Sequence, residues 1–312
     1  MTFDAQKDDH PLFWAAADYL ENRCYFFKGI FKKLKQVGMD YDLAEDLCRN
    51  CYNHVGQDME IYLEKVHSLI EFSVEFLRLQ MHLHKTGRYL YANFKEVEEH
   101  VYSNPGRKLS GPWYTWALYF SQIFWVIHWE VMRFFLTAYC RPGKAAGTVL
   151  EVPTGTGIFI ALFLKHNPGW KGTGVDLSDS SIAFTRDVLS WYHLENDRVS
   201  LIKHDIYTWQ PEERFDRIMC GEFLEHLENP LGVLKKMNAL LKPDGRVFIT
   251  VAVYAAMIDH IYLYHSADEV REHIREAGFL PEEELVQAVF DNKDPEGRDT
   301  PVNYCAILRK VR

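Results

Sequence analysis

The stretch TVLEVPTGTGIFI, residues 148–160, decides the fold of this chain. Its first half is a short apolar run that predicts a buried strand, and its second half carries Gly155 and Gly157 in a turn that opens a helix at about Gly157. Glycine lets a backbone approach a ligand where a Cβ would clash, and a helix N-terminus offers unpaired N–H groups. Glycines after strands also occur in ordinary tight turns. The stretch therefore predicts a strand–turn–helix unit that is suited to binding a ligand.

Acidic residues follow two further apolar runs downstream of this unit. Asp176 stands 19 residues after Gly157, the spacing at which a carboxylate reaches the ribose hydroxyls of a bound nucleoside, and Asp205 ends the next run. Each acid alone could equally be a helix N-cap. Strand-like and helical patterns alternate from residue 148 to residue 277, which predicts βαβ units in a parallel sheet. Residues 283–291 and 302–309 predict a hairpin on that sheet.

The first part of the chain has a different character. Helical periodicity runs through residues 9–139 without a convincing strand pattern. The predicted helices span residues 11–34, 42–51, 59–84, 94–101 and 113–139. A short linker at residues 141–147, rich in glycine and proline, follows them. We therefore predict an all-α cap over residues 1–140 and an α/β domain over residues 141–312.

Composition narrows the class of partner and compartment. The 35 basic and 44 acidic residues of the 312-residue chain leave a net charge of −9, which disfavours a nucleic-acid backbone as the main partner. The six cysteines are too few for a disulfide scaffold, and the polar N-terminus does not resemble a signal peptide, so we expect a cytoplasmic protein. The apolar residues 119–139 contain His128, Glu130 and Arg133, so we interpret them as a buried helix rather than a membrane span. A single Cys48–Cys51 pair without a second pair predicts no metal site.

Four motifs in order resemble those of the S-adenosylmethionine (SAM)-dependent methyltransferases with a seven-stranded sheet. VLEVPTGTG (149–157) resembles the family's VLEIGCGTG, and GVDLS (174–178) matches its second motif. EFLEHL (222–227) is similar to the EVLEHL form of many small-molecule methyltransferases, and LKPDG (241–245) is similar to the LKPGG turn. The motifs cover about a third of the chain and imply a Rossmann-like, mostly parallel seven-stranded sheet. The antiparallel C-terminal hairpin and the all-α N-terminal region complete the predicted α/β fold.

The resemblance implies that the cofactor is S-adenosyl-L-methionine and indicates which residues hold it. Asp176 would take the ribose hydroxyls, Leu177 would lie against the adenine, and the turn would line the methionine and ribose portion. The predicted cofactor-binding residues are Glu151, Thr154, Gly155, Thr156, Gly157, Asp176, Leu177, Asp205, Ile206 and Cys220. Pro153 departs from the family pattern, because it replaces the first glycine and removes one N–H donor. This leaves the pose of the cofactor's amino-acid tail open.

Methyl transfer is an in-line displacement, which needs a general base only when the acceptor carries a proton. The predicted catalytic residues are Glu222 and His226, after the fourth strand, and His260, after the fifth. Glu225 and Asp259 lie in the same two segments. The aromatic residues 113–129 are expected to be mostly core, and the residues predicted to bind the acceptor are Tyr114, Tyr119, Tyr254 and His265.

The sequence thus predicts a SAM-dependent methyltransferase that acts on a small molecule, and we expect it to belong to specialised metabolism. Three other functions stay open at this point. They are a SAM-using enzyme that transfers the aminocarboxypropyl group or cyclises SAM, a protein or RNA methyltransferase, and a non-catalytic SAM-binding protein. The oligomeric state and the identity of the acceptor do not follow from the sequence.

Overall fold

The computed structural model describes residues 9–103, 112–141, 143–194, 197–291 and 293–311. Its centre is a seven-stranded sheet with the strand order β3-β2-β1-β4-β5-β7-β6. The strands are β1 (Gly147–Glu151), β2 (Trp170–Asp176), β3 (Val199–Lys203), β4 (Phe215–Gly221), β5 (Leu241–Val253), β6 (Phe279–Ala288) and β7 (Val302–Lys310). The first five strands are parallel, and β7 pairs antiparallel with both β5 and β6. The predicted α/β fold with its antiparallel C-terminal hairpin is confirmed.

The chain reverses its direction across the sheet at β1. It proceeds from β1 outward through β2 to β3, and then returns to place β4 on the other side of β1. In an open sheet of this kind, ligands bind outside the carboxyl ends of the strands at such a switch point. The topology therefore indicates a ligand-binding site at the carboxyl ends of β1, β2 and β4.

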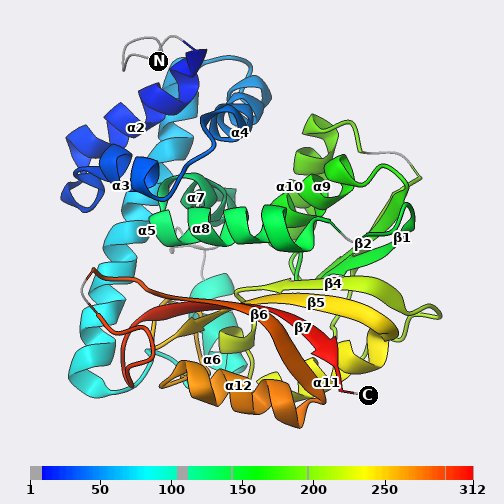
Figure 1. Ribbon diagram of the computed structural model, residues 1–312. Coiled ribbons are helices and arrows are strands. Elements are labelled where there is room, and N and C mark those ends of the chain that lie inside the picture. Colours follow the sequence, from blue (N-terminus) through cyan, green and yellow to red (C-terminus); the bar gives the residue numbers. More distant parts are fainter. Residues whose placement is uncertain (1–8, 104–111, 142, 195–196, 292, 312) are drawn as a thin grey trace.

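Alternating side chains of the strands divide the core between the two faces of the sheet. Val149 and Phe248 belong to one buried cluster, whereas their chain neighbours Leu150 and Val247 belong to the other. This is the two-residue period of a strand with both faces covered. Helices α9 (Ile158–His166) and α10 (Asp179–Trp191) lie on the first face, and α11 (Pro230–Leu240) and α12 (Ala267–Glu276) lie on the second (Figure 1).

The N-terminal half is helical, as the sequence predicts, and it packs on the first face of the sheet (Figure 1). The long helix α5 extends past the sheet, and buried Gln80 of this helix donates to the carbonyl of Tyr254 at 2.9 Å and accepts from the N–H of Ala256 at 2.9 Å. The helical segments are α2 (Pro11–Arg23), η1 (Tyr25–Phe27), α3 (Ile30–Gln36), α4 (Tyr41–His54), α5 (Met59–Thr86), α6 (Phe94–Val97), η2 (Glu98–Tyr102), α7 (Pro112–Phe124), α8 (Val126–Phe134) and η3 (Phe135–Tyr139).

Two of the predicted helices were wrong in their extent. Residues 11–34 are not one helix, because Cys24 is extended and Gly29 adopts a left-handed conformation with φ +75°. Residues 113–139 are interrupted at Trp125, which has ψ +120°, and end in a π-helical turn. Apolar periodicity continues across both breaks, so the sequence pattern does not reveal them. No helix in the described parts of the chain combines the length and apolar character that a membrane span requires.

A buried carboxylate ties together the amino-terminal ends of the strands, opposite the switch-point edge. Asp216 of β4 accepts hydrogen bonds from Lys144 at 3.0 Å, from Lys242 at 2.7 Å and from the N–H of Thr148 at 3.0 Å. Burial acts to raise the pKa of Asp216, but the hydrogen bonds from Lys242 and Lys144 outweigh this effect, and the pKa lies well below its ordinary value. The ionised carboxylate is therefore the form that the fold stabilises.

Replacing Asp216 with asparagine is expected to lower the thermal unfolding midpoint at pH 7. A carboxyl whose pKa is depressed in the folded state contributes stability above its unfolded pKa, about 3.9, and this stability is lost as the pH falls through the folded pKa. The gap between the wild-type and variant midpoints should thus be constant from about pH 7 to 5 and narrow below about pH 4. The exposed Asp197 provides the control variant Asp197→Asn. A gap that is independent of pH would contradict this account.

Candidate active site

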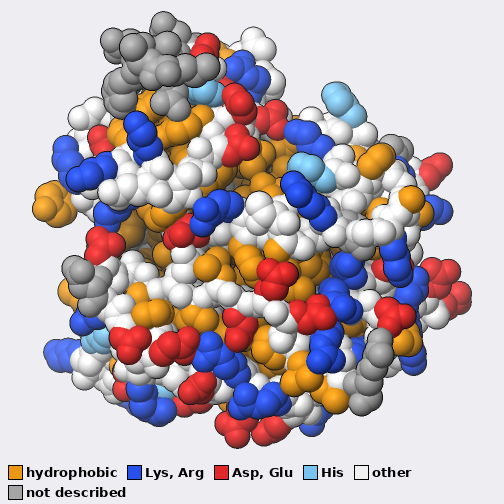
Figure 2. All heavy atoms as spheres, viewed as in Figure 1, with side chains coloured by type: hydrophobic (Ala, Val, Ile, Leu, Met, Phe, Trp, Pro, Cys, Tyr) orange, Lys and Arg blue, Asp and Glu red, His pale blue; other side chains and the backbone are white. Residues whose placement is uncertain are grey.

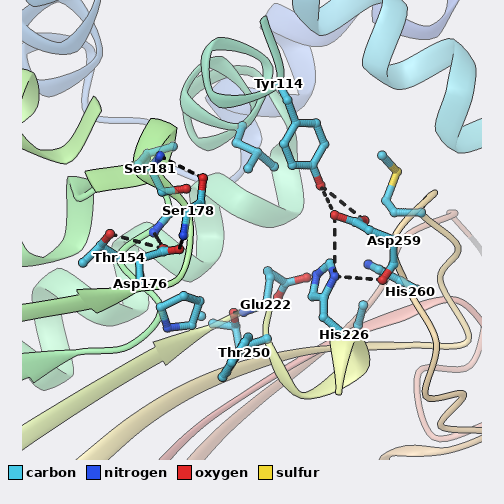
Figure 3. Close-up of a pocket in the computed structure, with 18 of the residues that line it drawn as sticks. Tyr114, Thr154, Asp176, Ser178, Ser181, Glu222, His226, Thr250, Asp259 and His260 are labelled. Carbon is cyan, nitrogen blue, oxygen red and sulfur yellow. Dashed lines mark hydrogen bonds and ion pairs between the residues drawn. The ribbon is translucent and has the colours of Figure 1, made fainter. Parts of the chain in front are cut away.

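A cavity of about 1090 Å³ opens at the carboxyl ends of β1, β2 and β4. Its walls come from the turn after β1, the ends of β2 and β4, the segments after β3 and β5, the start of β7, and helices α5, α7 and α8. The cavity thus joins the switch-point edge of the sheet to the helical half of the chain. Figure 3 shows its polar residues in two groups, one around Asp176 and one around His226.

The first polar group is built on the glycine turn between β1 and α9. Gly155 and Gly157 both have positive φ, at +51° and +69°, so the turn needs glycine at these positions. Asp176, at the end of the neighbouring β2, accepts from the N–H of Gly155 at 3.1 Å and from the hydroxyl of Thr154 at 3.3 Å (Figure 3). The acid predicted to bind the cofactor therefore also holds the turn in place.

The carboxyl end of β2 adds a second set of contacts. The other oxygen of Asp176 accepts from the N–H of Ser178 at 2.9 Å, and the Ser178 hydroxyl caps α10 by accepting from the N–H of Ser181 at 3.2 Å. Ser178 is therefore the N-cap of α10. Asp176 does not serve as that cap, and it lines the cavity. Burial raises the pKa of Asp176 although these N–H groups oppose the shift. Leu177 is 54% exposed and lines the cavity, so it presents an apolar surface there.

The segment after β3 continues the same wall. The N–H of His204 donates to the carbonyl of Asp176 at 3.0 Å, which places Asp205 and Ile206 beside the end of β2. Asp205 accepts from the N–H of Tyr207 at 2.9 Å, and the buried Ile206 lines the cavity. Two carboxylates and two apolar side chains thus meet at one edge of the sheet.

These residues fit an adenosyl group. The carboxylate of Asp176 can accept from ribose hydroxyls, and Asp205 can accept from an amino group. The exposed Leu177 and the buried Ile206 both line the cavity and offer apolar contact to a flat base. Helix α9 begins at Ile158 on the cavity wall, where the N-terminal N–H groups of a helix suit an anionic group such as a carboxylate. Buried Glu151 accepts from the N–H of Ile160 at 3.3 Å, and burial raises its pKa well above the ordinary value.

The second polar group begins with Glu222, the first residue after β4. Glu222 has φ +45°, a conformation that is uncommon for residues other than glycine and that concentrates at functional sites. Its N–H donates to the carbonyl and the hydroxyl of Thr250, at 3.0 and 2.9 Å, and its carboxylate accepts from Asn303 at 3.1 Å. Strands β5 and β7 therefore hold Glu222 in a strained conformation at the cavity.

Two histidines and an aspartate lie beside Glu222 (Figure 3). The rings of His226 and His260 are 4.7 Å apart between centroids, and the His226 Nδ1 lies 3.6 Å from the Asp259 carboxylate. Tyr114 donates to the same carboxylate at 3.1 Å, and Tyr102 does so at 3.0 Å. Burial and the neighbouring His226 lower the pKa of His260 to about 3, so His260 is neutral near pH 7. Burial and Asp259 raise the pKa of Tyr114 well above its ordinary value, so its hydroxyl remains a donor.

Beyond this group the cavity becomes aromatic and apolar. The side chains of this part are Phe72, Phe76, Leu118, Trp125, Val131, Phe159 and Val289. His128 also lines this part of the cavity. Its burial lowers its pKa to about 4, so it is neutral near pH 7. This part of the cavity is suited to an apolar or aromatic molecule.

The structure brings most of the predicted site residues together at the cavity. Those that line it are Glu151, Thr154, Gly155, Thr156, Asp176, Leu177, Asp205, Ile206, Glu222, His226, His260 and Tyr114. Gly157 caps α9 behind this wall, and the side chain of Cys220 belongs to the buried cluster on the α11 face of the sheet. Cys220 precedes Gly221, which lines the cavity, and adjacent strand residues face opposite sides.

Three residues that were predicted to bind the acceptor lie away from the cavity wall. Tyr119 is fully buried and donates to the carbonyl of Leu47 at 3.0 Å. Tyr254 has φ +48°, and its ring packs near His84 and His265. His265 pairs with Asp299 at 2.6 Å. Tyr254 is buried in a small core cluster with Leu79 and Leu83, so the packing of the segment after β5, which periodicity does not reveal, directs it away from the cavity.

Other lining residues were missed by the sequence argument. Asn303 reaches the site because antiparallel β7 begins at the edge where the parallel strands end. Tyr102 comes from η2, and Phe72 and Phe76 come from α5, all far from the motifs in the sequence. Phe72 and Phe76 share one helical face, but the same spacing is typical of core residues. No local signal distinguishes them.

Comparison with known proteins agrees with this geometry. Residues 126–289 match the family model described as "Methyltransferase domain". The chain is 32% identical over 114 residues to a "Ubiquinone biosynthesis O-methyltransferase" of Pseudomonas paraeruginosa, covering 35% of this chain and 46% of the relative. It is 33% identical over 138 residues to "(S)-coclaurine N-methyltransferase" of Papaver somniferum, covering 44% and 38%. The matched segments thus span less than half the length of these curated relatives.

Solved structures share the fold at low sequence identity. Mitomycin 7-O-methyltransferase MmcR superposes with a TM-score of 0.53 at 15% identity, covering 77% of this chain and 68% of that one. The pyocyanin biosynthetic protein PhzM superposes with a TM-score of 0.53 at 16% identity, covering 78% and 72%. The family model spans more than half of the chain, and the protein therefore belongs to the methyltransferase domain family of SAM-dependent enzymes.

Proposed function

We propose that the protein transfers a methyl group from S-adenosyl-L-methionine to a small-molecule acceptor. One observation carries this proposal: a single cavity runs from the adenosyl-type edge of the sheet, past Glu222 and His226, into an aromatic region of the helical half. Donor and acceptor would meet where the two polar groups face each other. The two curated relatives named above are an O-methyltransferase and an N-methyltransferase, which supports an oxygen or nitrogen acceptor.

We assign cofactor binding and acceptor binding to different parts of the cavity wall. Asp176, Leu177, Asp205 and Ile206 would hold the adenosine, and the turn from Thr154 to Gly157 with Glu151 would hold the amino-acid portion. Residues 141–312 would thus bind the cofactor, and the helical residues 1–140 would bind the acceptor, with Tyr114 at the border. Bound in this way, the cofactor supplies an electrophilic methyl group on a sulfonium centre.

Glu222, His226 and His260 are the residues that we propose act on the acceptor. Alignment and water exclusion supply much of the rate of such a displacement, and the buried walls of α5 and α7 would exclude water. Glu222 and His226 lie at the point where the cavity passes from the sheet edge to the aromatic region, so they could orient the acceptor atom or receive its proton. The neutral His260 packs edge-on against His226 and would hold the ring of His226 in place.

Other outcomes stay open to test. Attack at another carbon of the sulfonium would transfer an aminocarboxypropyl group or cyclise the cofactor. A protein or RNA acceptor is disfavoured by the acidic chain and by the buried aromatic pocket, and Figure 2 shows acidic and basic side chains mixed over the face in view. Specialised metabolism and a cytoplasmic location stay predictions from the sequence.

Incubation of the protein with SAM and a cell extract tests the proposal by mass spectrometry. We expect S-adenosylhomocysteine together with a metabolite that has gained one methyl group. Glu222→Gln should slow formation of this product by about 10- to 100-fold, because an amide cannot receive the proton of the acceptor. Glu213→Gln, at an exposed position outside the cavity, should not. Accumulation of methylthioadenosine in place of S-adenosylhomocysteine would reject methyl transfer.

A further inference from the structure

Three side chains at the cavity form an arrangement that the methyl-transfer proposal does not explain. Glu225, His226 and His260 each offer one potential ligand atom, and these atoms lie within 4.8 Å of one another. Glu225 and His226 belong to the short helix η4 (Leu224–His226) after β4, and His260 belongs to the segment after β5. Because β4 and β5 are neighbours in the sheet, their following segments converge. The result is a set of one carboxylate and two imidazoles.

The hydrogen bonds of the two histidines select the neutral tautomer that can bind a metal ion. The Nδ1 of His226 lies 3.1 Å from the backbone oxygen of Asp259, and the Nδ1 of His260 lies 2.8 Å from that of Ala255. A carbonyl oxygen can only accept, so each Nδ1 carries the proton in the neutral ring and each Nε2 keeps a free lone pair. Metal-binding histidines are commonly oriented by such a bond from the second ring nitrogen.

The buried carboxyl of Glu225 is a second feature that points to a cation at this cluster. The Glu225 side chain is fully buried close to the carboxyl of Glu222 and the backbone of Ala252, but neither carboxylate oxygen makes a hydrogen bond of ordinary geometry within the described part of the chain. A buried carboxyl without a partner costs free energy, since it has lost the hydrogen bonds of water without replacement. Buried charges in proteins are typically paired or coordinate a metal. A cation beside Glu225 would remove this cost.

The position of the cluster suggests what such a cation would face. His226 and His260 line the cavity, and so does Glu222, whereas Glu225 lies behind them. Three protein ligands leave coordination positions open, as in catalytic rather than structural metal sites. Those positions would be directed to the part of the cavity between the adenosyl edge and the aromatic region.

We propose that Glu225, His226 and His260 bind one divalent first-row transition cation, which takes an oxygen of the acceptor into its open positions. Imidazole with carboxylate is a ligand set that suits Zn²⁺, Fe²⁺ or Mn²⁺. The acceptor class is then a hydroxyl compound, because a cation lowers the pKa of an oxygen bound to it. The hydroxyl proton passes to Glu222, which lines the cavity and is not a metal ligand, the oxygen lone pair forms the bond to the methyl carbon, and the carbon–sulfur electron pair stays on sulfur. The acceptor part of this inference rests on the proposed function, and the metal site does not.

The metal site is tested by titration of the chelator-treated full-length protein with Zn²⁺ in a calorimeter, and with Mn²⁺ by electron paramagnetic resonance. We expect one site per chain, and a thermal unfolding midpoint that rises with Zn²⁺. Glu225→Gln, which keeps the shape of the side chain, and His260→Ala should each weaken binding by about 10- to 100-fold. The matched control is His265→Ala, since His265 lies outside the cavity.

The outcomes separate this inference from the proposed function. The metal site is overturned if neither cation binds stoichiometrically, or if Glu225→Gln and His260→Ala bind as the wild type does. In that case, continued S-adenosylhomocysteine binding in the same calorimeter would leave the methyltransferase proposal standing. If the cation binds but methyl transfer is unchanged by a chelator, the role of the cation in holding the acceptor is rejected. If Glu225→Gln unfolds, the His260→Ala titration decides.

Discussion

Replacement of Asp176 with alanine is expected to weaken the binding of S-adenosylhomocysteine by about 100- to 10,000-fold. Hydrogen bonds to a charged group are worth about 1.5–3 kcal/mol each, and the carboxylate would accept from two ribose hydroxyls. The same carboxylate accepts from the N–H of Gly155 and the hydroxyl of Thr154, so its loss also releases the turn that faces the ligand. Isothermal titration calorimetry measures the effect directly.

The control for this experiment lies three residues further along the chain. Asp179 is the first residue of α10, and its exposed carboxylate pairs with Lys203 at 2.6 Å. Asp179→Asn should leave the affinity within about twofold of the wild type, because an exposed ion pair contributes about 0–1 kcal/mol. If Asp176→Ala bound S-adenosylhomocysteine as tightly as Asp179→Asn does, the assignment of this edge to the cofactor would have to be abandoned.

Replacement of Gly157 with alanine is expected to have the largest effect on stability of any single methyl addition in the turn. Gly157 has φ +69°, and a left-handed conformation costs an L-residue about 1–2 kcal/mol. An added Cβ would also stand 2.5 Å from the Cγ2 of Thr185, a fully buried side chain of α10. We expect the free energy of unfolding to fall by about 3 kcal/mol or more, because the packed core cannot yield without cost. Urea denaturation measures this.

The variant Gly155→Ala distinguishes the cost of the left-handed conformation from the cost of the contact with Thr185. Gly155 also has positive φ, at +51°, but a Cβ added there would meet nothing within 4 Å. Gly155→Ala should therefore lose only the conformational part, about 1–2 kcal/mol. Equal losses for the two variants would show that the contact with Thr185 is not the cause.

The two expected results concern one structural unit. Gly157 sets the start of α9 and its distance from α10, and Asp176 joins the end of β2 to the turn. The Gly157 variant acts on the packing behind the cavity wall, and the Asp176 variant acts on the wall itself. We therefore expect Gly157→Ala to act mainly on the free energy of unfolding and Asp176→Ala to act mainly on the affinity for S-adenosylhomocysteine.

Much of the fold could be predicted from the sequence because its signals are local. The apolar runs of β1, β2 and β4, the glycines after β1, the acid that ends β2 and the acid after β3 follow one another at short, regular intervals. Parallel strands bring their carboxyl ends to a common edge, so the order of these motifs is enough to assemble the cofactor side of the cavity. Asp176 and Asp205 lie there as the sequence predicts.

The acceptor side could not be predicted in the same way. Tyr114 and Tyr119 come from the same aromatic helix, yet Tyr114 reaches the cavity and Tyr119 points into the core toward Leu47. Likewise His260 joins His226, whereas His265, five residues later, pairs with Asp299. Which of two similar side chains faces the cavity depends on the packing of neighbouring elements and not on the local pattern.

The sequence by itself determined the α/β architecture and the edge of the sheet at which the cavity lies, and it predicted the residues that would hold an adenosyl group. Only the tertiary structure decided that Asn303 and Tyr102 join that edge, that Glu222 is held at positive φ, and that Glu225 is buried beside two oriented histidines. The physical reason is the range of the interactions. Strand period and turn chemistry act over a few residues, whereas these contacts join segments that only the packed sheet and helices bring together.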